Sequence, residues 1–451
     1  MGKSLWTDTV TLPERETLRG DVKTDVLVIG GGICGILCAY MLKKAGVDCL
    51  LVEGDRIAGG ITENTTAKVT SQHGLIYDRI IRSLGRDRAR LYLEANEKAL
   101  EQYRELCAGI DCDWEEQTAF VYSRQDREKI EREVRAVHSL GFPAEFVSRL
   151  PLPFPVEGAV SFPHQAQFHP LKFVEGIIRD LPIYEHTFVE NIEGHTAVTS
   201  HGKIQADRFI VATHFPFINR HGSYFLKLYQ QRSYVLALEQ AARLDGMYID
   251  EARGGLSFRG CGELLLLGGG GHRTGKKGGG WAVLEEFAAQ VYPRAEVKYR
   301  WAAQDCMSLD GIPYIGRYSA GTKNLFVATG FQKWGMTTSM AAALLLCDLV
   351  QGRGNAWAEV FSPSRSMIKP QLFLNAVEAT ANLLTPSLKR CPHMGCALKW
   401  NARERTWDCP CHGSRFERDG ALIDNPAKRG CRCLGDDTGA GKEQANKQDQ
   451  E

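Results

Sequence analysis

Residues 24–53 read TDVLVIGGGICGILCAYMLKKAGVDCLLVE, and this stretch decides the fold. Its first six residues form a short β-rich run that ends in three glycines. The following residues, 33–46, have apolar side chains at helical spacing and end on Gly46, which suits a helix C-terminus. Residues 47–53 are a second apolar run, typical of a buried strand. The pattern predicts a strand–helix–strand unit of about thirty residues.

The glycines between the first strand and the helix have the spacing GxGxxG. Gly30 permits the tight turn, Gly32 lets the backbone approach a pyrophosphate, and Gly35 lets helix and strand pack closely. The helix N-terminus then offers unpaired N–H groups to the phosphates. Glu53, at the end of the second strand, would accept hydrogen bonds from ribose hydroxyls and repel a 2′-phosphate. These features predict dinucleotide binding; the alternative is a glycine-rich turn with no ligand.

Length and charge limit the possible functions. The chain has 451 residues, which suggests two or three domains. Lys plus Arg number 55 and Asp plus Glu number 54, so the net charge of +1 argues against a nucleic-acid partner. Apolar runs such as 340–347 are far shorter than the roughly 20 residues that span a bilayer, and residues 1–20 are polar. We expect a cytoplasmic protein with no membrane span.

Hydrophobic periodicity predicts further elements along the chain. Helices are expected at 86–109, 124–140, 171–181, 281–291, 335–350 and 371–384. Strands are expected at 183–192, 203–212 and 324–328, with strand-like sequence across 233–270. The first two helices are rich in charge, so we expect them to be exposed to solvent. The mixture of elements predicts an α/β protein.

Three later blocks of sequence make this part similar to the D-amino-acid-oxidase-like flavoprotein superfamily, which includes glycine, sarcosine and glutamylputrescine oxidases. The blocks are GGITENTTAK at 59–68, ADRFIVAT at 206–213 with the strand 187–189 before it, and DGIPYIG at 310–316 followed by NLFVATG at 324–330 and WGM at 334–336. The resemblance covers roughly residues 20–355 and implies FAD rather than NAD. It also implies oxidation of the C–N bond of an amine or amino acid.

The resemblance assigns residues to FAD. The implied set is Gly30, Gly32, Gly35, Glu53, Thr66, Lys68, Val189, Ala212, Gly330, Gly335 and Met336. The helix that begins near Gly335 could direct N–H groups at the N1/O2 edge of a reduced flavin, or it could be an ordinary glycine-capped core helix. Cys306 is similar to the covalent flavin attachment site of sarcosine oxidases, but it lies closer to Asp310 than that pattern requires. We therefore expect noncovalent FAD.

A second motif lies near the C-terminus, where Cys391 and His393 are followed, after fifteen residues, by Cys409 and His412. Two thiolates and two imidazoles can bind zinc or a Rieske [2Fe–2S] centre. The surrounding sequences, CPHMGC and CPCHGSRF, resemble those of Rieske proteins. The resemblance implies that the cysteines bind one iron and the histidines the other. It also implies a disulfide between Cys396 and Cys411, which would be surplus thiols in a zinc site.

The Rieske-like segment departs from its family in several ways. Ser414 lies where family members donate a hydroxyl hydrogen bond to a bridging sulfide, but Phe416 replaces a tyrosine, which should lower the potential. The segment is short, so we expect a small all-β lobe that leans on the flavoprotein. Cys431 and Cys433 match nothing in the family and are interpreted as free surface thiols.

These features predict the domain organisation. We expect a Rossmann-like FAD-binding domain, an interleaved α+β substrate domain and the Rieske lobe. The FAD-binding segments are about 20–75, 183–220 and 305–355, and the substrate segments are about 76–182 and 221–304, all within an oxidoreductase of residues 1–375. A linker at 376–390, the lobe at 391–434 and a disordered tail at 435–451 complete the chain.

A flavin beside a one-electron cluster suggests that substrate gives a hydride to FAD and that electrons then leave singly through the cluster. The recipient would be an external acceptor protein or a quinone. The alternative is an electron-transfer or redox-sensing relay with no small amine substrate. Candidate substrate contacts are His73, Arg232, Tyr234, His272 and Lys333, although each residue type more often has an ordinary surface or core role. Residues 264–267 are all leucine, with no lysine to promote reaction with oxygen, so we expect a dehydrogenase rather than an oxidase.

Overall fold

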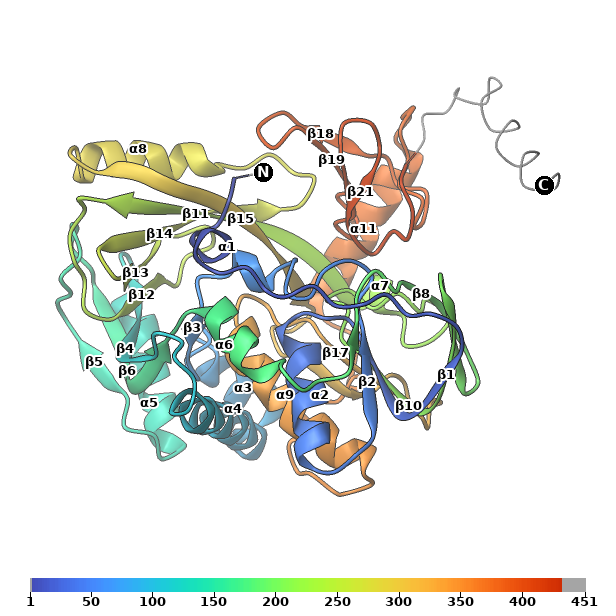
Figure 1. Ribbon diagram of the computed structural model, residues 1–451. Coiled ribbons are helices and arrows are strands. Elements are labelled where there is room, and N and C mark those ends of the chain that lie inside the picture. Colours follow the sequence, from blue (N-terminus) through green and yellow to red (C-terminus); the bar gives the residue numbers. More distant parts are fainter. Residues whose placement is uncertain (1, 432–451) are drawn as a thin grey trace.

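A computed structural model of the chain describes residues 2–431. The predicted tail at 435–451 and Cys433 lie outside these residues. Two large sheets and one small sheet organise the molecule, and the small sheet forms a separate lobe beside helix α11 (Pro370–Leu384) (Figure 1).

The predicted strand–helix–strand unit forms the centre of the first large sheet. Strand β1 (Val22–Ile29) is followed by α2 (Ile33–Lys44) and β2 (Cys49–Val52), and β1 pairs in parallel with both β2 and β10 (Gly202–Val211). The other strands are β17 (Leu325–Thr329), β16 (Tyr314–Arg317), β7 (Ile183–Tyr184), β8 (Val189–Glu193) and β9 (Thr196–Thr199). Helix α9 (Gly335–Val350) packs against α2 on one face of this sheet (Figure 1).

The second large sheet has nine strands and is covered on one face by α8 (Trp281–Val291) (Figure 1). In spatial order its main path is β15 (Glu296–Ser308), β11 (Leu228–Glu239), β14 (Leu264–Arg273), β13 (Ser257–Cys261), β12 (Met247–Asp250), β4 (Glu115–Ser123), β6 (Gly158–Gln167) and β3 (Lys68–Val69), with β5 (Glu145–Val147) beside β6. The chain therefore passes back and forth between the two sheets, and the inner strands of each come from distant segments.

Two helices that we expected to be solvent-exposed are only half exposed. Helix α4 (Arg86–Cys107) buries Tyr92, Leu100 and Tyr103 and packs against α9, and α5 (Arg127–Ser139) also buries an apolar side. Their charges lie on the outer side, while the 3.6-residue period collects the apolar residues on the inner side. The other helical elements are α1 (Leu5–Thr9), a 3-10 turn at Thr62–Asn64, α3 (Tyr77–Leu84), α6 (Pro170–Ile177), α7 (Tyr224–Lys227) and α10 (Ala358–Phe361). Among the helices within residues 2–431, none has the length and apolarity needed to cross a membrane.

The lobe is a four-stranded antiparallel sheet, as expected of a small all-β unit. Its strands are β18 (Lys399–Asn401), β19 (Thr406–Asp408), β20 (Arg415–Phe416) and β21 (Leu422–Asp424). The first cysteine–histidine loop, 391–396, lies between α11 and β18, and the second, 409–414, connects β19 to β20. The sheet is too small to enclose both loops, so the loops depend on neighbours outside the lobe.

Candidate functional site

A single cavity of about 1520 Å³ extends from the glycine turn after β1 to the lobe, and residues from both large sheets line it. Ten of the eleven residues predicted to contact FAD line this cavity: Gly30, Gly32, Glu53, Thr66, Lys68, Val189, Ala212, Gly330, Gly335 and Met336. Gly35 is the exception. The far end of the cavity is lined by lobe residues 422–428. The cavity thus brings together residues from sequence blocks that are more than 270 positions apart.

The three glycines of the turn have separate structural roles. A Cβ on Gly30 would lie 2.6 Å from the carbonyl oxygen of Ala212, and a Cβ on Gly35 would collide with the carbonyl oxygen of Gly30. Both glycines are therefore required for packing within the protein. A Cβ on Gly32 would meet only the Oγ1 of Thr62, at 3.6 Å. Gly32 leaves open space at the N-terminus of α2, where a pyrophosphate would need to lie.

Glu53 ends β2 at the edge of the same cavity. Its carboxylate accepts hydrogen bonds from the N–H of Gly31, at 2.6 Å, and from the N–H of Asp55, at 2.9 Å. Burial raises the pKa of Glu53, although these backbone hydrogen bonds oppose that shift. The carboxylate is thus held at the position where the adenosine ribose is expected, and an acceptor at this position fits a dinucleotide.

Four lysines line the cavity, all from outside residues 264–267: Lys68, Lys333, Lys369 and Lys428. Lys68 on β3 donates to the Oγ1 of Thr66 at 3.2 Å, and burial, assisted by nearby Arg259, lowers the pKa of Lys68 to about 7. Lys333, just before α9, also lines the cavity. The all-leucine strand therefore does not describe the charge of this site by itself.

The two predicted histidine contacts are not cavity residues. His73 is buried between the hydroxyl of Tyr92, at 2.6 Å, and the carbonyl of Thr70, at 2.8 Å, and burial lowers the pKa of His73 to about 3. His272 bonds through Nε2 to the hydroxyl of Tyr234 at 2.9 Å. Both imidazoles are used for internal hydrogen bonding, and neither lies in the cavity lining where a substrate contact was predicted.

Arg232 and Tyr234 line the cavity but already have a partner in the lobe. Arg232 donates through Nε to Glu404 at 3.1 Å, and the hydroxyl of Tyr234 donates to the same carboxylate at 2.8 Å. Of the five candidates, only Lys333 lines the cavity and has no hydrogen bond or ion pair among those resolved for residues 2–431. No sequence pattern indicated that Arg232 would bind Glu404, which lies 172 positions away.

Asp305 on β15 is a cavity residue that sequence reasoning missed. It accepts a hydrogen bond from the hydroxyl of Ser233 at 3.0 Å, and burial raises the pKa of Asp305 against the opposing charge of Lys333. Alternation along the strand places Cys306 on the opposite face, where its thiol lies 3.7 Å from the hydroxyl of Thr329. Cys306 packs in the core rather than in the cavity, which favours noncovalent FAD.

The predicted cluster residues converge at the tip of the lobe. The imidazoles of His393 and His412 have ring centroids 5.0 Å apart, and both Nδ1 atoms are buried with no hydrogen-bond partner among the described residues. Burial lowers the pKa of His393 to about 4 and of His412 to about 3, so both rings are neutral near pH 7. The thiols of Cys391 and Cys409 are hydrogen-bonded to each other. Two buried unpaired nitrogens and two thiols fit the donor set of a Rieske centre.

The outer nitrogens of both imidazoles are bound by the flavoprotein. The Nε2 of His393 lies 3.2 Å from the side-chain amide of Asn219, and His412 donates to the carbonyl of Phe225. A hydrogen bond on the outer nitrogen fixes the orientation of an imidazole that binds metal through the other. The flavoprotein therefore aims both histidines inward.

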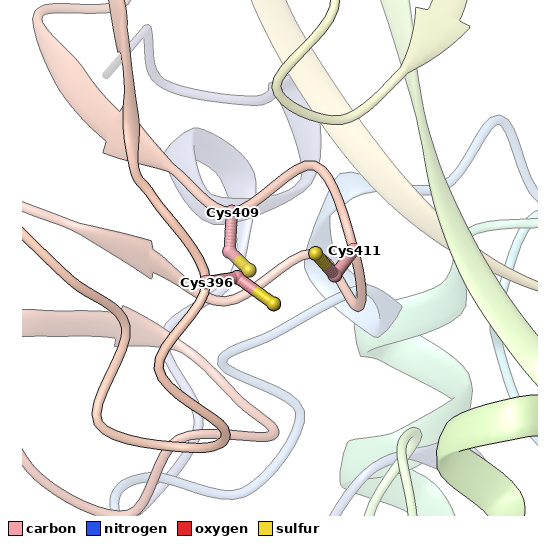
Figure 2. A group of neighbouring side chains, drawn as sticks. All are labelled: Cys396, Cys409 and Cys411. Atoms are coloured by element: carbon pink, nitrogen blue, oxygen red, sulfur yellow. The ribbon is translucent and has the colours of Figure 1, made fainter. Parts of the chain in front are cut away.

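The predicted disulfide between Cys396 and Cys411 is not present; both residues are free cysteines. Their sulfur atoms lie with that of Cys409 in a group whose members are all within 4.8 Å of one another (Figure 2). The thiols of Cys396 and Cys411 hydrogen-bond to each other and to that of Cys409. The three-thiol group contains no imidazole. The two buried Nδ1 atoms make the four-residue set the better metal site.

Other cysteine-segment residues are buried in the lobe. Ser414 and Phe416 have no exposed surface, and the Ser414 hydroxyl hydrogen-bonds to the Cys391 thiol. Cys431 is only 5% exposed and its N–H donates to the carbonyl of Gly420. The expectation that Cys431 is a surface thiol is therefore wrong, because the last described residues fold back over the lobe.

Side chains of the second large sheet hold the second cysteine–histidine loop. Arg273 donates to the carbonyls of residues 410 and 411 at 3.0 and 3.1 Å, Gln230 to the carbonyl of residue 412 at 2.9 Å, and Gln304 to the carbonyl of residue 413 at 2.9 Å. Four consecutive carbonyls are thus satisfied from outside the lobe. The small lobe does lean on the flavoprotein, as its length suggested.

A buried ion-pair network fastens the two units together. Glu404 lies between Arg232 and Arg415, whose side chains are 2% and 1% exposed. Arg415 also pairs with Asp408 at 3.2 Å and Asp424 at 3.1 Å. Burial alone would raise the pKa of Glu404, but the two guanidinium groups hold it at about 2. Removing Glu404 would leave the buried guanidinium of Arg232 without its carboxylate partner.

The cavity and the cluster residues share a wall of three residues. Thr213 and His214 line the cavity, and the ring of Phe215 lies against both imidazoles, with centroid distances of 6.2 and 6.1 Å. Asn425 of the lobe donates to the carbonyl of Thr213 at 2.6 Å. The segment that follows β10 therefore separates a dinucleotide site from a cluster site by a very short path.

Comparison with known proteins agrees with this arrangement. Residues 25–349 match the FAD-dependent oxidoreductase family, DAO. The chain belongs to the DAO family. Residues 379–435 match the Rieske [2Fe–2S] domain, so this DAO protein carries FAD and a [2Fe–2S] cluster. It is an FAD-dependent oxidoreductase with a C-terminal Rieske domain.

Relatives share all or part of this DAO architecture. YhfW of Bacillus subtilis (strain 168), which carries the name of a Rieske 2Fe-2S iron-sulfur protein, is 35% identical over 94% of this chain and 96% of its own. Glycine oxidase from Geobacillus kaustophilus superposes with a TM-score of 0.65 at 20% identity, covering 76% of this chain and 99% of the oxidase. L-proline dehydrogenase from P. horikoshii gives 0.65 at 16% identity, covering 77% and 98%. The two solved structures establish the DAO fold alone.

Proposed function

We propose that the protein oxidises the C–N bond of an amine or amino acid and passes the electrons singly through its Rieske centre to an external acceptor. The observation that carries this proposal is the wall at residues 213–215, which is shared by the cavity and the imidazole side of the cluster site. A short fixed separation suits electron transfer within one chain. When bound, FAD accepts two electrons as a hydride, and a [2Fe–2S] centre carries one electron at a time.

The proposed cofactor contacts follow from the geometry of the site. Gly32 and the N-terminus of α2 would hold the pyrophosphate, Glu53 the ribose, and the start of α9 the flavin edge. Helix α9 begins after Trp334 with no side-chain cap, so its first N–H groups are available to negative charge. For the cluster, we propose Cys391 and Cys409 on one iron and His393 and His412 on the other.

The charged residues of the cavity suit a zwitterionic substrate. Lys333, Arg79 and Arg253 line it and could bind a carboxylate. Asp305 could accept hydrogen bonds from an ammonium group, or take its proton, since burial raises the pKa of this carboxyl. A free amino group is needed for loss of hydride from the adjacent carbon. Lys333 and Asp305 lie close enough to interact, as the two ends of one amino acid require.

An anaerobic substrate screen tests the proposal. We expect one or more amines or amino acids to bleach the flavin absorbance, followed by the EPR signal of a reduced histidine-ligated cluster. In a His412→Ala variant, the same substrate should still bleach the flavin without producing that signal. If no amine or amino acid bleaches the flavin, but NAD(P)H or a ferredoxin reduces the protein readily, the relay function would replace this one.

A further inference from the structure

Helix α11 buries polar side chains and exposes apolar ones, which is the reverse of an ordinary surface helix. Its two asparagines, Asn375 and Asn382, are each 5% exposed, whereas Phe373 is 62%, Val377 68% and Leu384 77% exposed. A surface helix of a globular protein normally buries its apolar side and exposes its polar side. The apolar side of α11 therefore faces solvent over most of its length in the described part of the chain.

Specific hydrogen bonds hold the helix in this orientation. Asn375 accepts from Arg273 at 3.0 Å, and the carbonyl of Asn382 accepts the N–H of Ala397 at 3.0 Å. Glu378, the single acidic residue between positions 365 and 394, is turned inward and pairs with Lys276 at 2.7 Å. Rotating the helix to hide its apolar side would break all three interactions. The exposure is therefore built into the fold.

The exposed apolar residues gather in one part of the chain. Eight of the twelve large apolar side chains with high exposure among residues 2–431 fall between positions 368 and 394, so this segment is exceptional. We call these eight residues the apolar face: Ile368, Phe373, Leu374, Val377, Leu383, Leu384, Leu388 and Met394. Large contiguous apolar patches on soluble proteins usually mark a binding surface.

The apolar face extends between the two functional sites. At its start, Lys369 and Leu374 line the cavity. At its end, Met394 belongs to the first cysteine–histidine loop, which packs against the last turn of α11: the N–H of Ala397 bonds to the helix, and a Cβ on Gly395 would lie 3.9 Å from Leu383. Figure 1 shows α11 at the side of the molecule, adjoining the lobe. Whatever covers this face lies beside both sites.

The charges around the face identify its occupant. Lys369 precedes the helix, and Lys389 and Arg390 follow it. Lys389 and Arg390 donate to backbone carbonyls, so neither positive charge is balanced by a carboxylate, and the single carboxylate of the segment is turned inward. Two copies of the chain meeting here would bring these cations together without a balancing acid from either segment. Lipid headgroups of negative charge would balance them, while the apolar side chains enter the interface.

We propose that the apolar face is a docking surface for an anionic lipid bilayer, on which the protein binds peripherally. The helix lies in the plane of the interface, with its aliphatic side chains and Phe373 in the acyl boundary and its flanking cations among the headgroups. This binding depends on surface chemistry alone and does not require the proposed amine oxidation. It would hold the rim of the cavity and the first cluster loop at the lipid surface.

Flotation of the holoprotein with vesicles tests the proposal. We expect the protein to float with equimolar phosphatidylglycerol and phosphatidylcholine and to remain unbound with phosphatidylcholine alone. Val377→Ser combined with Leu384→Ser should reduce the bound fraction at least tenfold. The matched control is Val283→Ser, which alters an exposed valine of the distant helix α8 and should bind as the parent does. Flavin absorbance and thermal unfolding of each variant report whether it is folded.

Several results would overturn the proposal. Absence of binding to the anionic vesicles would do so, as would equal binding by the parent and the folded double variant. Sedimentation tests whether a second copy of the chain covers the face instead. If the parent does not bind vesicles but forms a dimer, and the double variant is a monomer, the face is an interface between two copies. Substrate-dependent bleaching of the flavin is measured on the same samples, so failure of docking and failure of the proposed activity are distinguishable.

Discussion

The glycine turn after β1 and the loop after β19 each build a cofactor site from a few residues of backbone, but the glycine turn is supported from within its own sheet, whereas the loop is supported from a sheet outside its lobe. Gly30 and Gly35 pack within a sheet that forms around them. The loop at 409–413 has four carbonyls held by side chains from β11, β14 and β15, up to 182 positions away. The comparison shows that the dinucleotide site is supported by its own sheet, whereas the cluster site depends on contacts with the second large sheet.

The largest expected effect comes from breaking that dependence at Glu404. In Glu404→Gln, the charges of Arg232 and Arg415 lose their shared carboxylate inside the protein. Removing one partner of a buried pair costs about 3–5 kcal/mol. We expect the cluster to be lost while FAD is retained, as measured by iron content and flavin absorbance.

The matched control for this change is Glu263→Gln. Glu263 pairs with Arg243 on the surface, and their side chains are 81% and 73% exposed. Exposed pairs are worth about 0–1 kcal/mol, so this variant should keep both cofactors and its thermal stability. If the two variants behave alike, the buried network does not fasten the lobe.

The converse change is Gly32→Val. A side chain there meets little protein but fills the space beside the N-terminus of α2, so the chain should fold and bind FAD at least about a hundredfold more weakly. The iron content should be unchanged. Gly354→Val, at an exposed glycine with open space around it, is the control. Loss of both cofactors in Gly32→Val would mean that the two units do not fold independently.

The rate of reaction with oxygen tests the charge of the cavity around the flavin. We expect a dehydrogenase, so that air reoxidises the substrate-reduced protein more slowly than turnover with an artificial acceptor. A positive charge near a flavin promotes oxygen reduction, and Lys68 with its pKa of about 7 is charged below that pH and neutral above it. The residual oxygen rate should therefore fall by about tenfold as pH rises through 7.

Rapid mixing of reduced protein with air-saturated buffer across pH measures this rate. Lys68→Met should give a low rate with no step near pH 7. Reoxidation as fast as turnover, with stoichiometric peroxide, would refute the dehydrogenase assignment.

The smallest expected effects concern the cluster potential. Ser414→Ala removes the hydroxyl that bonds to the Cys391 thiol and should lower the potential, whereas Phe416→Tyr adds a donor and should raise it. One hydrogen bond of about 1.4 kcal/mol corresponds to about 60 mV for one electron. Voltammetry of the two variants checks both signs. Unchanged potentials would mean that neither side chain faces the cluster.

Local features were predictable from the sequence, because their signals lie close together in the chain. The strand–helix–strand unit at 24–53 and the pairs of cysteine and histidine at 391–412 each place their key residues within a few turns of backbone. The pairing of Arg232 with Glu404 could not be predicted, since it depends on how two distant units meet. Helical periodicity revealed that residues 371–384 are amphipathic, but it could not indicate that the polar side faces inward.

The remaining errors have the same physical origin. Lys68 and Lys333 were predicted to contact FAD and substrate, but the expectation about reaction with oxygen considered the strand 264–267 alone and did not include their charges. Helix α4 carries many charged residues, so we expected it to be exposed although one of its sides is buried. Cys431 is buried because the end of the described chain returns to the lobe, and a disulfide between Cys396 and Cys411 was inferred from family resemblance alone. Each error concerns contacts between segments rather than the segments themselves.

The alternation of the chain between its two large sheets has a consequence for biosynthesis. The first sheet acquires β10 only after residue 211 and β17 only after residue 329, so the nucleotide site cannot close until three quarters of the chain has left the ribosome. The platform for the lobe, β11 with β15, is complete by residue 308, before the cluster segment is made. Synthesis order thus presents a complete platform to the cluster loops as they emerge.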